Sequence, residues 1–306
     1  MSIRILAADP VDAAAVAKFR ANGWEVVEQH YEQDEVGTVL KDFDAVIIRA
    51  ATKIKKQQLD DERGGRLKLI MRAGVGMDNI DIPYAESMGI TCRNTPNSSS
   101  NAVAELAIGL LFSCARCISA AGVTMKQQRW EKKAYEKLGF ELAGKTIGVI
   151  GYGRIGRLVG QKAQALGMNV LSVVHRNKPE GVECETMHFV TMDELLAQSD
   201  VICLCAPSGD KPLVDAEAIA KMKDGVVLIN VSRGSNIVEL DVLDALNSGK
   251  IRAAGIDVWM DEKNPNWELA GHPMVSPIPH LGGSTKEGAK KIGEELVQIA
   301  EDFFGV

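Results

Sequence analysis

The stretch TIGVIGYGRIGR at residues 146–157 decides the fold. Its apolar run is followed by the spacing G-x-G-x-x-G and then by a helical pattern, the context in which this spacing indicates a dinucleotide-binding turn. Gly151 permits the tight turn, Gly153 lets the backbone approach a pyrophosphate, and Gly156 lets the helix pack on the strand. The N–H groups of residues 154–155 then face the phosphates at the start of the helix. A tight turn without a ligand is the alternative interpretation.

Apolar runs alternate with helical patterns on both sides of this stretch. Short buried strands are expected at IRILAA, WEVVE, DAVIIR, LKLIMR and GITCR, and the alternation restarts after a long helical segment near 98–127. Such alternation predicts parallel sheets covered by helices on both faces. We therefore predict an α/β protein of two doubly wound units, with a boundary near 94–105.

The bulk composition narrows the class of protein. A chain of 306 residues is long enough for about two domains. The net charge of −6 and a pI near 5.5 argue against nucleic-acid or anionic-membrane partners, which need a basic surface. No apolar stretch reaches ~18 residues, and the N-terminus MSIRILAADP lacks the features of a signal peptide. A cytoplasmic protein is expected.

The six cysteines suggest free thiols. Cys203 and Cys205 lie in an apolar strand pattern, and Cys114 and Cys117 form a CxxC inside a helical pattern. One CxxC is compatible with a redox pair or half of a zinc site, but the chain has no second ligand pair at zinc spacing. We expect buried structural cysteines and no metal site.

The end of the next predicted strand, within NVLSVVHRNKPE at 169–180, bears on the choice of dinucleotide. An acidic residue about 20 residues beyond the glycine turn normally binds the adenosine ribose 2′-hydroxyl. Val174 occupies that place, and Arg176, after His175, offers a bidentate partner for a 2′-phosphate. The pattern favours NADP(H) over NAD(H). The alternative is a solvated turn beside NAD(H).

Several motifs occur in an order that resembles one family, the D-isomer-specific 2-hydroxyacid dehydrogenases, over essentially the whole chain. They are RAGVGMDNID (72–81), NTPNSSSNAVAELAIGLL (94–111), GKTIGVIGYGRIGR (144–157), INVSRG (229–234), AAGIDVW (253–259) and SPIPHLGGST (276–285). Within the family, RAATK (49–53) and MKQQRWEKK (125–133) are most similar to the D-3-phosphoglycerate dehydrogenase branch. The chain resembles a short form without the C-terminal regulatory domain of longer members.

The resemblance implies two Rossmann-like, doubly wound parallel-sheet domains, with the cofactor domain inserted into the substrate domain. On this chain the substrate domain would comprise residues 1–97 and 284–306, and the dinucleotide-binding domain residues 98–283. A homodimer formed through the cofactor domain is also implied.

Three catalytic residues carry over from the resemblance. Arg233 corresponds to the arginine that holds the substrate carboxylate and carbonyl, Glu262 to the catalytic glutamate, and His280 to the acid–base histidine. Oxidation of a 2-hydroxy acid removes a hydride from carbon and a proton from the hydroxyl, and a neutral imidazole can take that proton. Arginine stays charged, so it serves as a fixed clamp. Lys263 follows Glu262 where the family usually has proline, so the local loop is expected to differ.

Cofactor contacts come from the glycine turn, from the next strand and from the resemblance, which places Asp257 at the nicotinamide carboxamide. The expected contacts are Gly151, Gly153, Arg154, Ile155, Gly156, Val174, His175, Arg176, Ala206, Pro207, Val231, Asp257, Gly282 and Gly283.

A phosphorylated substrate needs cations beyond the catalytic set, at the strand ends where open α/β sheets bind ligands. By resemblance, Arg49 and Lys53 are phosphate contacts, the backbone of Val75 and Gly76 seats the carboxylate, and Arg72 assists either group. Together with Arg233 and His280 these residues form the expected substrate site.

Three functions remain open from the sequence. The first is oxidation of 3-phosphoglycerate to 3-phosphohydroxypyruvate, on the route to serine. The second is NADPH-dependent reduction of glyoxylate, hydroxypyruvate or another small 2-oxo acid, which the missing acid at Val174 favours. The third is a nucleotide-sensing binding module, which the complete set of Arg233, Glu262 and His280 disfavours.

Overall fold

The computed structural model describes residues 2–173, 181 and 184–306. The chain divides into two compact units, and each is described by itself. The first unit comprises Met1–Ser99 with Gly283–Val306, and the second comprises Ser100–Gly282. The sequence placed the divisions at 97/98 and 283/284.

The first unit is built on a five-stranded parallel sheet of order β2-β1-β3-β4-β5. Its strands are β1 (Arg4–Ala7), β2 (Glu25–Glu28), β3 (Ala45–Ile48), β4 (Leu69–Arg72) and β5 (Thr91–Asn94). The strand order reverses between β1 and β3. The chain therefore leaves these two strands toward opposite faces, which opens a crevice at their carboxyl ends.

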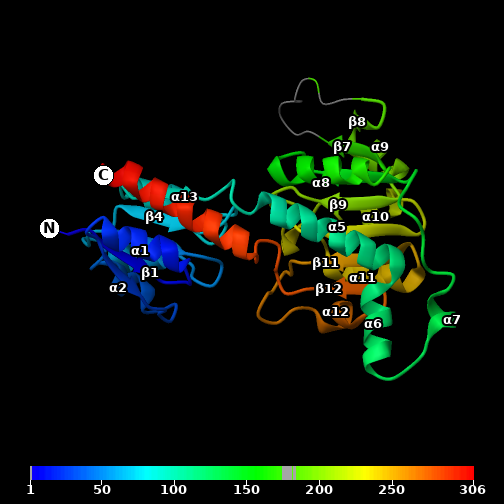
Figure 1. Ribbon diagram of the computed structural model, residues 1–306, viewed down its shortest axis with the longest axis horizontal. Helices are drawn as coiled ribbons and strands as arrows, with labels where there is room; N and C mark the ends of the chain where they lie inside the picture. Colours follow the sequence, from blue (N-terminus) through cyan, green and yellow to red (C-terminus); the bar gives the residue numbers. More distant parts are fainter. Residues whose placement is uncertain (1, 174–180, 182–183) are drawn as a thin grey trace. The chain divides into compact units, whose positions relative to one another are not determined.

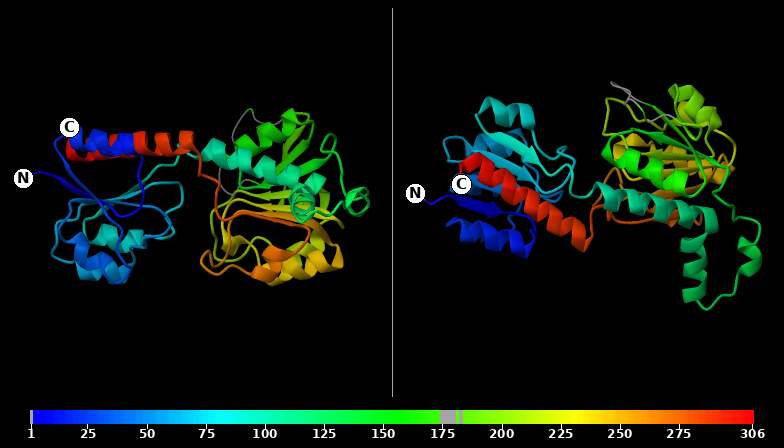
Figure 2. Two further views of the ribbon diagram at one scale, coloured as in Figure 1. Left: turned by 60° about the horizontal axis from the view of Figure 1, so that its bottom comes forward. Right: turned by 45° about the horizontal axis from the view of Figure 1, so that its top comes forward.

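Helices cover both faces of this sheet. One face carries α1 (Ala13–Ala21) and α13 (Lys286–Phe304), whose side chains share a core with Ile5 and Leu69. These two helices are far apart in sequence but lie side by side (Figures 1 and 2). The other face carries α2 (Val36–Leu40), α3 (Lys56–Glu62) and α4 (Ile82–Ser87).

The second unit contains a seven-stranded parallel sheet of order β12-β11-β10-β9-β6-β7-β8. Its strands are β6 (Thr146–Ile150), β7 (Asn169–Val173), β8 (Met187–Phe189), β9 (Val201–Leu204), β10 (Val226–Asn230), β11 (Ile251–Ile256) and β12 (Val275–Pro277). The strand order reverses between β6 and β9, so the crevice of this unit opens beside the glycine turn that follows β6. The predicted α/β fold with two doubly wound parallel sheets is confirmed.

Two helical layers enclose the second sheet. On one face lie α5 (Ser100–Arg116) and α8 (Arg154–Ala165). On the other face lie α9 (Met192–Gln198), α10 (Ala216–Lys221), α11 (Glu239–Ser248) and α12 (Trp267–Gly271). A 3₁₀ turn, η1 (Gly234–Asn236), follows β10.

The long helical segment expected near 98–127 is two helices. Cys117 adopts a left-handed conformation with φ of 53° and separates α5 from α6 (Ile118–Lys126). α6 and the short α7 (Lys132–Tyr135) project beyond the sheet of the second unit (Figure 1). No single helix among the described residues has the length and apolar character to cross a membrane. Only α5 and α6 taken together reach that length, and they are bent by 69°.

Cys114 and Cys117 are free, buried thiols at this bend. Cys114 packs in the core under α5, and burial raises its pKa to about 12. Both thiols are buried, as the sequence predicts.

Candidate active site

The glycine turn between β6 and α8 is shaped by close packing at two of its three glycines. Gly151 has φ of 98°, and a Cβ there would lie 2.6 Å from the backbone nitrogen of Ala206 after β9. A Cβ on Gly156 would lie 2.0 Å from the carbonyl oxygen of Gly151. Side chains are therefore excluded at both positions, which sit where the strand order reverses.

Gly153 differs because a Cβ there would meet no atom within 4 Å. It is the N-cap of α8 and offers no side-chain hydrogen bond to the first turn, where Arg154 is exposed and Ile155 half-buried. The first N–H groups of this 12-residue helix thus adjoin open space at the crevice. This arrangement fits a dinucleotide pyrophosphate. Val174, His175 and Arg176 lie outside the described residues.

Two buried asparagines organise the loop that carries Arg233. Asn230, at the end of β10, donates from Nδ2 to the carbonyl oxygen of Arg233 at 2.9 Å. Asn236 donates from Nδ2 to the carbonyl oxygen of Ala206 and to Ser232 Oγ, both at 2.9 Å. The loop after β10 is thereby tied to the loop after β9. No signal in the sequence marks either asparagine, because burial shows only in the structure.

Gly234 brings the Arg233 loop against the segment that leads to Glu262. A Cβ on Gly234 would lie 2.1 Å from the carbonyl carbon of Trp259. On that segment, the backbone nitrogen of Met260 donates to Glu239 Oε1, at the start of α11, at 3.0 Å. Direct backbone contact therefore sets the separation of the Arg233 and Glu262 loops.

His280 and Glu262 form a close pair. His280 Nδ1 lies 2.6 Å from Glu262 Oε1, and both side chains are partly exposed. A carboxylate accepts hydrogen bonds, so neutral His280 carries its proton on Nδ1 and presents Nε2 as an acceptor. The pair can therefore take a proton from a bound hydroxyl and return it.

Asp257 anchors the loop on which His280 stands. Only 1% of Asp257 is exposed, and its carboxylate accepts from the backbone nitrogens of Leu281 at 2.6 Å and Gly282 at 3.0 Å. The backbone nitrogen of His280 donates to the carbonyl oxygen of Asp257 at 2.8 Å. Burial raises the pKa of Asp257, while the two backbone donors and His280 act in the opposite direction. The expected contact of Asp257 with a carboxamide stays a prediction beside this anchoring.

The other expected cofactor residues differ in their surroundings. Val231 is buried in the core under α5, and Pro207 is exposed beside half-buried Ala206. Gly282 is buried, and a Cβ there would come within 2.9 Å of Asp257 Oδ2. Gly283 is the first residue of the returning segment of the first unit.

The expected substrate residues outside the catalytic set belong to the first unit. Arg49 follows β3 at the reversal of strand order, and Lys53 is exposed on the same loop. Arg72 ends β4, and a Cβ on Gly74 would lie only 1.4 Å from its Nη1, so its guanidinium lies over this glycine. Asn94 donates to the carbonyl oxygen of Val75 at 2.6 Å and supports the turn that includes Gly76.

Comparison with known proteins identifies the family. Residues 108–282 match the model described as D-isomer specific 2-hydroxyacid dehydrogenase, NAD binding domain. The chain is also 38% identical over 301 residues to a hydroxypyruvate reductase of Thermotoga maritima, covering 96% of both chains. The protein belongs to the D-isomer-specific 2-hydroxyacid dehydrogenases.

Other relatives of this dehydrogenase carry different substrate names. It is 36% identical over 307 residues to a D-3-phosphoglycerate dehydrogenase of Archaeoglobus fulgidus, with 98% of this chain covered. It spans only 58% of the length of that relative. Among solved structures, a glyoxylate reductase from Paecilomyes thermophila superposes with a TM-score of 0.88 at 29% identity, covering 98% of this chain and 95% of that one.

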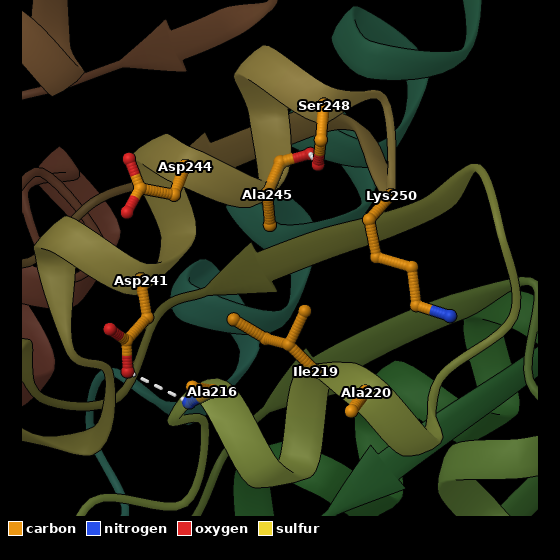
Figure 3. A pocket seen from close by; sticks show the side chains of 8 residues that line it. All are labelled: Ala216, Ile219, Ala220, Asp241, Asp244, Ala245, Ser248 and Lys250. Atoms are coloured by element: carbon orange, nitrogen blue, oxygen red, sulfur yellow. Dashed lines mark hydrogen bonds between the residues drawn. The ribbon is translucent and has the colours of Figure 1, made fainter.

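A separate depression in the dehydrogenase lies between α10 and α11 (Figure 3). It measures about 420 Å³ and is lined by Ala216, Ile219, Ala220, Asp241, Asp244, Ala245, Ser248 and Lys250. None of these residues belongs to the predicted site. Among the described residues, no three His, Cys, Asp or Glu side chains are grouped so that they could hold a metal ion.

Proposed function

We propose that this dehydrogenase interconverts 3-phosphoglycerate and 3-phosphohydroxypyruvate, the first step from 3-phosphoglycerate toward serine. The observation that carries the proposal is the position of Arg49. It follows β3 at the reversal of strand order, where open sheets bind ligands, and Lys53 on the same loop adds a second cation. Relatives named D-3-phosphoglycerate dehydrogenase support the choice.

In this proposal the catalytic roles follow from side-chain chemistry. When bound, the nicotinamide accepts the hydride during oxidation and supplies it during reduction. His280 Nε2 takes the hydroxyl proton during oxidation, and Glu262 stabilises the resulting imidazolium through Nδ1. Arg233 binds the carboxylate and polarises the carbonyl. The glycine turn and the start of α8 hold the pyrophosphate.

We also propose a preference for NADP(H). The family model describes the domain as NAD binding, which does not separate the two dinucleotides. The sequence lacks an acid at Val174, so nothing at that position repels a 2′-phosphate, and Arg176 can pair with one.

A second candidate function is the reduction of hydroxypyruvate. One observation favours it: the hydroxypyruvate reductase of Thermotoga maritima aligns over 96% of both chains, whereas the phosphoglycerate dehydrogenase relative is much longer. Hydroxypyruvate lacks the phosphate, so the phosphate role proposed for Arg49 and Lys53 would then fail.

Initial rates of reduction at pH 7 test the proposal. NADH and NADPH are each combined with 3-phosphohydroxypyruvate, hydroxypyruvate and glyoxylate, using the wild type and Arg49→Ala. We expect fast reduction of 3-phosphohydroxypyruvate, faster with NADPH, and a large loss in Arg49→Ala for this substrate alone. Lys68→Ala is the control, because Lys68 is exposed and precedes β4, at the amino ends of the strands, whereas Arg49 lies at their carboxyl ends. Equal losses for all substrates would refute the phosphate role, and turnover of unphosphorylated acids alone would favour the second candidate.

A further inference from the structure

The loop that carries Arg49 and Lys53 is held by side chains from other strand ends. We call residues 49–54 the Arg49 loop. Asp9 follows β1, Gln33 follows β2 and Asn79 follows β4, and all three bind its backbone. None of these three residues was selected from the sequence.

Asp9 holds the loop through its N–H groups. Only 4% of this residue is exposed. Oδ2 accepts from the backbone nitrogens of Arg49 at 2.5 Å and Thr52 at 3.3 Å, and Oδ1 accepts from Thr52 Oγ1 at 3.1 Å. A buried carboxylate is costly unless several donors surround it, so Asp9 and the loop stabilise each other.

Asn79 holds the same two loop residues through their carbonyl oxygens. Its Nδ2 donates to the carbonyl oxygens of Arg49 and Thr52, both at 2.7 Å. The backbone carbonyl oxygen of Asn79 accepts from the backbone nitrogen of Ile54 at 2.9 Å. The side-chain amide supplies both donors to the loop, whereas the carboxylate of aspartate would face two carbonyl oxygens without any hydrogen to share.

The two anchors therefore define the shape of the Arg49 loop. Arg49 and Thr52 have both backbone N–H and C=O groups bound to Asp9 and Asn79, while Gln33 binds both backbone groups of Lys53 at 3.1 and 2.6 Å. Ala50 and Ala51 between them are exposed. The fixed parts of the loop are those from which the two cationic side chains extend.

We propose that Asp9 and Asn79 are positioning residues for substrate specificity. They fix the loop backbone so that Arg49 and Lys53 present their charges to the anionic end of the substrate without first being ordered by it. Pre-organisation of this kind lowers the entropy lost on binding. The inference rests on the proposed function for the identity of the anion, but the anchoring of the loop is testable without any substrate.

The first test is Asn79→Asp, with Gln57→Glu as the control. Gln57 is exposed on α3, so its change adds the same negative charge to the same unit without touching the loop. In Asn79→Asp we expect the KM for 3-phosphohydroxypyruvate to rise about tenfold or more, since two hydrogen bonds are lost and two oxygens repelled. The KM for nucleotide and the kcat with hydroxypyruvate should change less than about twofold. Hydrogen exchange of peptides spanning residues 47–56 should accelerate.

The second test uses variants of Thr52, so that the inference can still be tested if Asn79→Asp does not fold. Thr52 is buried, and Thr52→Val nearly keeps its volume but removes the hydroxyl donor to Asp9 Oδ1, whereas Thr52→Ser keeps this donor. We expect Thr52→Val to raise the KM for 3-phosphohydroxypyruvate severalfold and to speed exchange in the Arg49 loop. Thr52→Ser should stay close to the wild type. A uniform loss of activity in both variants would show a merely structural role.

The outcomes separate this inference from the proposed function. If the wild type does not reduce 3-phosphohydroxypyruvate, the proposed function fails, and exchange alone then decides whether Asp9 and Asn79 anchor the loop. If exchange in residues 47–56 is unchanged in Asn79→Asp and Thr52→Val, the positioning role is overturned, whatever the substrate.

Discussion

At the residue scale, the pair of His280 and Glu262 determines what the site can do with a proton. The 2.6 Å separation of Nδ1 and Oε1 places the proton of neutral His280 on Nδ1. The hydrogen bond from the backbone nitrogen of His280 to the carbonyl oxygen of Asp257 holds the backbone that carries the ring. His280 itself has φ of 53°, a conformation that few residues other than glycine adopt. The three bonds from Asp257 to residues 280–282 hold this loop in place.

Replacing His280 tests the acid–base role. His280→Ala should lower kcat by about 10²–10⁴-fold, because the proton acceptor is lost. Nucleotide affinity, measured by fluorescence titration, should be unchanged. Glu262→Gln keeps the size of the partner but removes its charge, so kcat should fall by a smaller factor. Turnover in His280→Ala close to that of the wild type would rule out the assignment.

Thiol reactivity at the residue scale should follow burial and hydrogen bonding. Cys184 is exposed, and hydrogen bonds led by the backbone of Thr186 lower the pKa of its thiol. Burial raises the pKa of Cys92 to about 11 and that of Cys114 to about 12. Since the thiolate is the reactive form, iodoacetamide at pH 7.5 should alkylate Cys184 first. Peptide mass spectrometry over time checks this order, and early labelling of Cys114 would contradict it.

At the scale of elements, the turn between β6 and α8 separates packing from ligand binding. Gly156 contacts the turn itself, whereas Gly153 faces open space at the start of α8. One glycine spacing thus serves two physical purposes, and substitution can tell them apart.

Alanine at Gly156 should mainly lower stability, whereas alanine at Gly153 should mainly weaken nucleotide binding. Gly156→Ala should destabilise the protein by about 1–3 kcal/mol, because the new methyl would overlap the carbonyl oxygen of Gly151. Gly153→Ala should cost about 1 kcal/mol or less, the usual penalty for alanine at an N-cap. It should nevertheless weaken nucleotide binding, because the methyl fills the space the pyrophosphate needs. Thermal unfolding with and without nucleotide measures both effects, and tight binding by Gly153→Ala would contradict the proposed pyrophosphate position.

At the scale of the whole molecule, α6 and the segment after it present an apolar surface. Four large apolar side chains are exposed there: Ile118, Val123, Met125 and Trp130, of which Trp130 is 79% exposed. Exposed apolar surface that is large enough marks a protein–protein interface in many proteins. We propose that a second copy of the chain covers α6 and the segment after it in a homodimer.

The oligomeric state tests whether α6 and the segment after it form a dimer interface. Val123→Asp should place a charge in the apolar interface and shift the dimer toward monomer at equal concentration, measured by sedimentation velocity. Leu240→Asp is the control, because Leu240 is also exposed, at 65% compared with 51% for Val123, but lies on α11. A wild type that sediments as a monomer would refute the proposal. Equal effects of Val123→Asp and Leu240→Asp would show that α6 is not the dimer interface.

The fold could be predicted from the sequence because its signals are local. Alternating strand and helix patterns, together with the glycine spacing after TIGVI, lie within short windows and require parallel, doubly wound sheets. The motifs led to the proposed catalytic set, and the structure brings two of its members, Glu262 and His280, within hydrogen-bond distance. The break at Cys117 was not predictable, because the apolar pattern continues through it and only backbone conformation interrupts the helix.

Only the tertiary structure decided how the functional loops are held. Asp9 lies 40 residues from Arg49, and Asp257 lies 24 residues from Leu281, yet each carboxylate binds the backbone of the distant loop. No local pattern marks such residues, since a buried aspartate and a solvated one have the same letter in the sequence. The sequence by itself determined the sheets, the glycine turn and which side chains are candidates for catalysis. The residues that hold the functional loops come from distant strand ends. Backbone groups outside helices and strands need hydrogen-bond partners, and only the fold decides which residues lie close enough to provide them.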